Sequence, residues 1–93
     1  MTTAILFHEV KNGEAWAEAW RKGRGSRHEL FAKVGVKART FRDPKNADST
    51  GLILEIPDMA KLQTLLDSDE GQKAMREDGL KIETMRLLTE FTP

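Results

Sequence analysis

The chain has 93 residues, of which 39% are hydrophobic and 32% are charged, and its formal net charge at pH 7 is zero. This length predicts one domain over residues 1–93, which buries only about 60–65% of its unfolded surface and would gain stability by dimerising. The lack of cysteine excludes a disulfide scaffold, thiol catalysis and a cysteine-ligated metal. Without an apolar run near ~20 residues or a signal-peptide pattern, we expect a cytoplasmic protein with no membrane partner.

Charge is distributed unevenly along the chain. Residues 21–45 hold nine basic and two acidic side chains (+7), whereas residues 55–90 hold nine acidic and five basic ones (−4). The basic stretch can attract an anionic ligand, or it can complement the acidic half of the same fold or of a partner subunit. An isoelectric point near 6.7 argues against nucleic acid as a partner.

Residues 4–10 predict the first strand. Alternate residues of a strand face opposite sides, and both sides of this segment are mostly apolar, so we expect both to be covered. Asn12 is placed to cap the following helix. In that helix Trp16 and Trp20 are four residues apart and lie on one face.

A break follows in the first helical layer. Two glycines within residues 22–26 are poor helix interior. Ser26 and Glu29 then form a capping box that restarts the helix, and Gly35 is a C-terminal stop signal. We therefore expect a broken or kinked pair of helices in place of one rod.

Residues 36–42 and 51–56 predict the second and third strands. The polar segment between them, residues 43–51, is rich in turn formers and predicts a hairpin loop that is too long for a two-residue tight turn.

Asp58 should cap the second helical stretch, which Ser68 recaps and Gly79 ends. Residues 81–91 predict the last strand. The order β-α-β-β-α-β is that of an α+β, ferredoxin-like domain with a four-stranded antiparallel sheet. Because helices cover one face of such a sheet and both faces are apolar here, we expect a symmetric homodimer that joins the sheets.

Residues 32–44 and 51–68 resemble the dimeric α/β-barrel proteins, in particular a small bacterial branch related in fold to antibiotic-biosynthesis-type monooxygenases. The resemblance implies ferredoxin-like subunits assembled as a homodimeric α/β barrel. Relatives include cofactor-independent monooxygenases acting on aromatic polyketides, haem-degrading enzymes, isomerases, cyclases and stress-response proteins. The first strand lacks the asparagine that haem-degrading members use, so no catalytic residue is carried over.

His28 is the candidate catalytic residue, because an imidazole in the basic stretch beside a backbone irregularity can act as general base on a small ligand. A histidine exposed near the helix cap is the alternative. Arg39 is a candidate for binding an anionic ligand, and pairing with Glu55 is its alternative role.

Three further residues are candidate ligand-binding groups. His8 can line a cavity or the dimer seam, or serve as a structural histidine. Trp16 and Trp20 can pack on the sheet or wall a pocket for a flat aromatic ligand. The two histidines are far apart in sequence and have no ligand spacing, so we expect no metal site.

No nucleophile elbow, dinucleotide fingerprint or phosphate loop is present, so no cofactor is implied. Two functions remain open: a cofactor-independent enzyme (monooxygenase, cyclase or isomerase) acting on a small aromatic or polyketide-like compound, and a non-enzymatic binding or stress-related dimer. A pocket with His28 or Arg39 directed inward would favour the enzyme, and a layer filled by the tryptophans and Phe31 would favour the second function. A ligand-sensing regulatory domain is a third option, disfavoured because no DNA-binding segment accompanies it.

Overall fold

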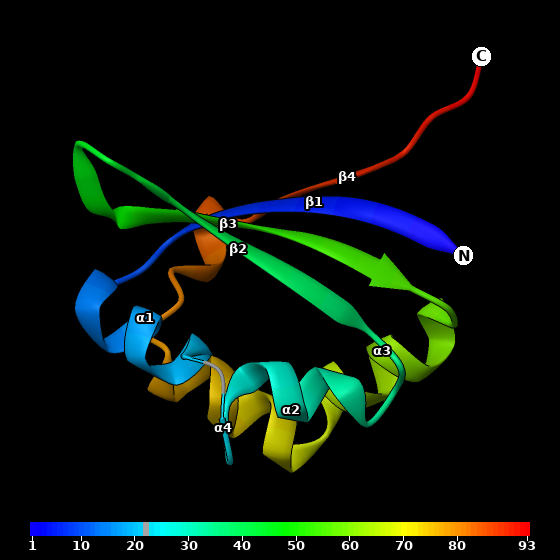
Figure 1. Ribbon diagram of the computed structural model, residues 1–93, viewed down its shortest axis with the longest axis horizontal. Helices are drawn as coiled ribbons and strands as arrows, with labels where there is room; N and C mark the ends of the chain where they lie inside the picture. Colours follow the sequence, from blue (N-terminus) through cyan, green and yellow to red (C-terminus); the bar gives the residue numbers. More distant parts are fainter. Residues whose placement is uncertain (22) are drawn as a thin grey trace.

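The computed structural model describes residues 1–21 and 23–93, and Lys22, which falls in the expected helix break, lies outside them. Within these residues a sheet and a layer of helices form two layers, with all the labelled helices on one side of the sheet (Figure 1). The strands are β1 (Thr2–Glu9), β2 (Lys37–Asp43), β3 (Asn46–Ile56) and β4 (Arg86–Thr89), and the helices are α1 (Gly13–Trp20), α2 (Arg27–Ala32), α3 (Met59–Asp67), α4 (Asp69–Glu77) and a short 3-10 helix, η1 (Ile82–Thr84).

The sheet is antiparallel and has the order β2-β3-β1-β4. This arrangement confirms the predicted α+β, ferredoxin-like fold. All of the predicted helix starts are confirmed, because the side chains of Asn12, Ser26, Asp58 and Ser68 accept hydrogen bonds from backbone N–H groups of the first helical turn.

The loop prediction for residues 43–51 is wrong. The chain reverses in two residues, Pro44 and Lys45, and β3 already begins at Asn46. Side chains of the polar segment stabilise the turn locally: Lys45 N donates to Asp43 Oδ1 (2.8 Å) and Asp48 N donates to Asn46 Oδ1 (3.1 Å). The polar composition therefore marks an exposed strand end and not a long loop.

The last strand is shorter than residues 81–91. Residues 82–84 form η1, and β4 covers only Arg86–Thr89. The Thr84 hydroxyl donates to Lys81 O (2.6 Å) and accepts from Glu9 N (2.9 Å). These bonds hold the chain in a turn beside the end of β1, so the ladder starts late.

The two faces of the sheet have different surroundings. The face toward the helices carries the buried core, including Ala4, Leu52, Leu54 and Ile56. The opposite face is called the outer face here. Its apolar side chains are Ile5, Phe7, Phe41, Ile53 and Leu88, and the register places Thr3, Lys37, Arg39, Glu55 and Arg86 on it as well. The apolar side chains, apart from half-buried Ile53, are 39–48% exposed in the single chain.

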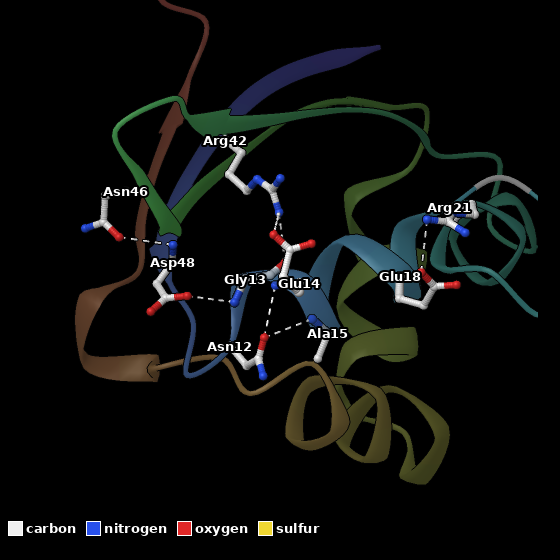
Figure 2. A network of polar contacts seen from close by, with 9 residues as sticks. All are labelled: Asn12, Gly13, Glu14, Ala15, Glu18, Arg21, Arg42, Asn46 and Asp48. Atoms are coloured by element: carbon white, nitrogen blue, oxygen red, sulfur yellow. Dashed lines mark hydrogen bonds and ion pairs between the residues drawn. The ribbon is translucent and has the colours of Figure 1, made fainter.

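Polar contacts fix the start of α1 against the β2–β3 hairpin (Figure 2). Gly13 N donates to Asp48 Oδ1 (2.7 Å), and Arg42 Nη1 donates to Gly13 O (3.3 Å) and to Glu14 Oε1 (3.3 Å). A Cβ at Gly13 would meet the carbonyl oxygen of Ala47. This close approach determines where the tryptophan face of α1 lies on the sheet.

Candidate functional site

A cavity of about 80 Å³ lies between the sheet and the helices. Its wall is mostly apolar and draws on the four labelled helices of Figure 1, α1 to α4, and on the inner sheet face. The polar side chains that line it are His8, Arg27 and Asp78. Its apolar lining includes Leu6, Trp16, Trp20, Leu30, Phe31, Leu52, Leu54, Leu62, Leu65, Leu66, Ala74, Met75, Leu80 and Met85.

His8 is the polar group that β1 brings to this cavity. Its even position places it on the inner face with Leu6, and its side chain is only 3% exposed. Within the described part of the chain, neither ring nitrogen has a hydrogen-bond partner. Leaving a buried polar group unpaired costs about 1–3 kcal/mol, so the ring is an unused donor and acceptor at the cavity wall.

Burial lowers the pKa of His8 from 6.5 to about 4. The imidazole is therefore neutral at pH 7, with one nitrogen donating and the other accepting. The ring of Trp16 meets it edge-on, with 6.0 Å between centroids. A neutral imidazole enclosed by apolar side chains can form a hydrogen bond with the hydroxyl group of a ligand. With this pKa the imidazole is itself a weak base.

The tryptophans of α1 pack on the core and also form part of the cavity wall. Trp16 and Trp20 lie 6.2 Å apart between ring centroids, and Trp20 stacks on Phe31 (5.5 Å, 15° between planes). The aromatic layer therefore fills much of the space under the sheet and leaves an unfilled cavity beside His8.

The ion pair between Arg27 and Asp78 joins the start of α2 to the end of α4 at the cavity wall. Arg27 Nε lies 3.0 Å from each Asp78 carboxylate oxygen, and Nη2 lies 2.9 Å from Oδ1. Nη2 also donates to Glu77 (3.2 Å). The side chains are 15% and 7% exposed. Hydrogen bonding to Asp78 raises the pKa of Arg27, whereas burial raises the pKa of Asp78 against the opposing effect of Arg27.

The sequence analysis did not single out this pair, although a signal was present. Arg27 is the first residue of α2 and Asp78 is the C-cap of α4. The helix dipole disfavours a cation at an N-terminus and an anion at a C-terminus. Two charges at the unfavourable ends of helices indicate that each has a partner elsewhere.

His28 and Arg39 do not line the cavity. Both line a groove of about 430 Å³ beside the edge strand β2, together with Lys37 and Glu55. The His28 ring contacts Trp20 edge-on (5.1 Å), and the Arg39 guanidinium lies 5.5 Å from the centre of the Phe41 ring. The structure thus divides the candidate residues between two places: His8, Trp16 and Trp20 at the cavity, and His28 and Arg39 at the groove.

The structure matches neither of the two pocket arrangements that the sequence analysis described, which were a pocket with His28 or Arg39 directed inward and a layer filled by the tryptophans and Phe31. An unfilled cavity lies beside the tryptophans, and the polar groups that line it are His8 and the Arg27–Asp78 pair. Among residues 1–21 and 23–93, no three His, Asp or Glu side chains are grouped so that they could hold a metal ion. No helix in those residues is long and apolar enough to cross a membrane.

Solved structures with the same architecture cover nearly the whole chain. A Nitrosomonas europaea protein assigned as an antibiotic biosynthesis monooxygenase aligns over 99% of this chain and 98% of its own, with a TM-score of 0.69 and 14% identity. PA3566 from Pseudomonas aeruginosa aligns over 99% and 93%, with a TM-score of 0.68 and 15% identity. The chain has the fold of antibiotic biosynthesis monooxygenase-like proteins.

A Deinococcus radiodurans protein, also assigned as an antibiotic biosynthesis monooxygenase, aligns over 100% of this chain and 93% of its own, with a TM-score of 0.55 and 10% identity. No protein-family model and no curated protein matches the sequence. At these identities the likeness concerns the fold, and function has to be argued from the cavity.

Proposed function

We propose that the cavity binds a small, mostly apolar ring compound with one hydroxyl group, and that the protein oxidises this compound with molecular oxygen. The unpaired, buried imidazole of His8 carries the proposal. A ligand hydroxyl would satisfy a ring nitrogen, while the apolar wall would hold the ring. The monooxygenase names of the structural neighbours support the choice of reaction.

The cavity volume limits the ligand to one ring. Sites for drug-sized ligands measure about 300–1,000 Å³, and an engineered cavity of about 150 Å³ holds benzene. The present cavity measures about 80 Å³, so even one ring requires side chains to move. Met75 and Met85 line the cavity and are the flexible side chains suited to this. A fused aromatic polyketide does not fit.

The proposed reaction converts a phenol to a quinone without a cofactor. One oxygen atom of O₂ forms the new carbonyl at a ring carbon, whose C–H bond breaks. The other oxygen atom leaves as water with that hydrogen and the hydroxyl hydrogen, so the phenol is oxidised by four electrons and O₂ is reduced by four. His8 would hold the hydroxyl in place.

Binding without turnover is the second candidate function. It is favoured by the pKa of about 4 for His8, because an imidazole of that pKa is a poor acceptor for a phenolic proton. The two functions share the ligand and differ in whether oxygen is consumed.

Phenol is titrated into the protein while the tryptophan fluorescence is followed with excitation at 295 nm. Bound phenol should change the fluorescence of Trp16 and Trp20, because both line the cavity. His8→Leu should weaken phenol binding by about 2- to 13-fold, since one hydrogen bond contributes about 0.5–1.5 kcal/mol. Toluene, which has the shape of phenol without its hydroxyl group, is the matched ligand and should bind His8→Leu at least as well as the wild type.

Oxygen uptake measured with an electrode then separates the two functions. Consumption of O₂ with bound phenol supports oxidation, and saturable binding without consumption supports the second candidate. Equal loss of phenol and toluene binding in His8→Leu, or no binding of either ligand to the wild type, contradicts the proposed site.

We further propose that a second copy of the chain covers the outer face in a symmetric homodimer. The apolar side chains of the outer face lie opposite the helices and are partly exposed in the single chain, which favours a partner that covers them. A two-fold axis uses the same face twice and buries both copies at once.

Ile5→Glu should raise the dimer dissociation constant by at least about 100-fold, because it would bury one carboxylate from each copy beside the apolar side chains of Ile53 and Leu88. Sedimentation velocity over a range of protein concentrations measures this. Met59→Glu is the matched control, since Met59 is a similarly exposed apolar side chain (40%) on α3, away from the outer face. A monomeric wild type, or equal dissociation in both variants, argues against the interface.

A further inference from the structure

A second hollow lies on the surface beside the cavity. It is a groove of about 260 Å³ whose lining comes from α2 and α4 and from the residues just before α2. The groove and the cavity share Arg27, Leu30 and Ala74 as lining residues. These shared side chains, called the partition here, therefore stand between the buried cavity and the surface groove.

The side chain of Arg27 is the long, polar member of the partition. Arg27 fills it with a guanidinium group that reaches from α2 to Asp78 and Glu77 on the α4 side. Leu30 and Ala74 complete it from α2 and α4. A rotation of the Arg27 side chain would change the partition without unfolding a helix.

The stability of this wall does not require an ion pair. Replacing a buried ion pair by apolar side chains of similar volume is often neutral or stabilising. Arg27 is 15% exposed and faces both hollows, so its charge keeps access to water on the groove side. Turning Arg27 toward the groove keeps its own charge near water but leaves Asp78, which is 7% exposed, without its partner, so the pair holds the cavity closed most of the time.

We propose that small molecules enter and leave the cavity between α2 and α4, and that the Arg27–Asp78 pair is the gate of this route. The gate rests on the proposed function in that a ligand must reach the cavity. Its location follows from the partition and does not depend on which compound binds.

Access is tested without any ligand by acrylamide quenching of the tryptophan fluorescence, because Trp16 and Trp20 line the cavity. Arg27→Ala should raise the bimolecular quenching constant at least about 3-fold by joining the cavity to the groove. Leu30→Ala opens the same partition from another side chain and should also raise it. Lys33→Ala is the matched control. It removes an ion pair from the C-cap of α2 to α4 (Lys33 Nζ to Glu70, 2.9 Å). Both residues of this pair line the groove, and neither lines the cavity.

Thermal melts identify any variant that is not folded, and Leu30→Ala keeps the test decisive if Arg27→Ala fails to fold. An unchanged quenching constant in the folded partition variants would overturn the gate, as would an equal rise in Lys33→Ala. The double variant Arg27→Met/Asp78→Leu retains a filled partition without charge and should keep the low quenching of the wild type. Phenol affinity at equilibrium tests the proposed ligand separately. If the gate is wrong, the quenching constants of the variants do not change, and if the ligand is wrong, the wild type does not bind phenol.

Discussion

Lowering the pH from 6.5 to 4 should remove about 3 kcal/mol of unfolding free energy through His8, and His8→Leu should abolish that part of the loss. The unfolded chain binds a proton at this histidine near pH 6.5, whereas the folded protein binds it only near pH 4. Between these values the unfolded state holds more protons, so stability falls as the pH falls. Well above pH 6.5 neither state is protonated at His8, and this contribution is constant.

Urea denaturation at pH 7 and pH 4 measures the effect. Carboxylates also titrate in this range, so the informative quantity is the difference between wild type and His8→Leu at each pH. His28→Leu is the control, since it removes the half-buried histidine beside Trp20 and leaves His8 in place. At pH 7 His8→Leu should be as stable as the wild type or more so, because it removes an unpaired buried polar group. Parallel pH profiles for wild type and His8→Leu would contradict the assigned burial.

Gly13→Ala should destabilise the protein by about 3 kcal/mol, as overpacking costs about 1–3 kcal/mol and here the obstacle is backbone. The added methyl group would fall on the carbonyl oxygen of Ala47 in β3, which cannot rotate away. Moving α1 to make room would stretch the bond from Gly13 N to Asp48, drawn in Figure 2. The same shift would move Trp16 at the cavity wall, so phenol affinity should fall together with stability.

Thermal and urea unfolding of Gly13→Ala and Gly25→Ala provide the comparison. A Cβ at Gly25 would meet no atom within 4 Å, but the backbone there has φ +80°, a conformation that costs other residues about 1–2 kcal/mol. Gly25→Ala therefore measures backbone strain alone and should have the smaller effect. The reverse order would show that the α1–hairpin contact is looser than the structure indicates.

Element order and helix boundaries were predictable because their signals are local. A capping side chain bonds to backbone two or three residues away, as Asn12 and Asp58 do, so the information lies within one turn. The short, mostly apolar run over residues 4–10 similarly identified β1. Strand ends were less predictable, since Asn46–Ser49 belong to β3 although their composition is that of a loop.

The candidate site was predictable only in part. Position parity in β1 places His8 on the inner face, but its lack of partners depends on residues from every layer of the fold. Arg27 and Asp78 are 51 residues apart, so no local pattern joins them. His28 was singled out for its basic neighbourhood, yet a shift of one helical position decides whether a side chain faces the cavity or the groove beside β2.

The sheet order β2-β3-β1-β4 has a consequence during synthesis on the ribosome. The first strand to be made occupies an inner position, and its partners are residues 49–56 and 86–89. At about 5–20 residues per second, β1 waits roughly 2–10 s for β3 and longer for β4. During that interval its apolar side chains, Ile5 and Phe7 among them, have no neighbouring strand, so the nascent chain is open to chaperones and to pairing with other copies of itself.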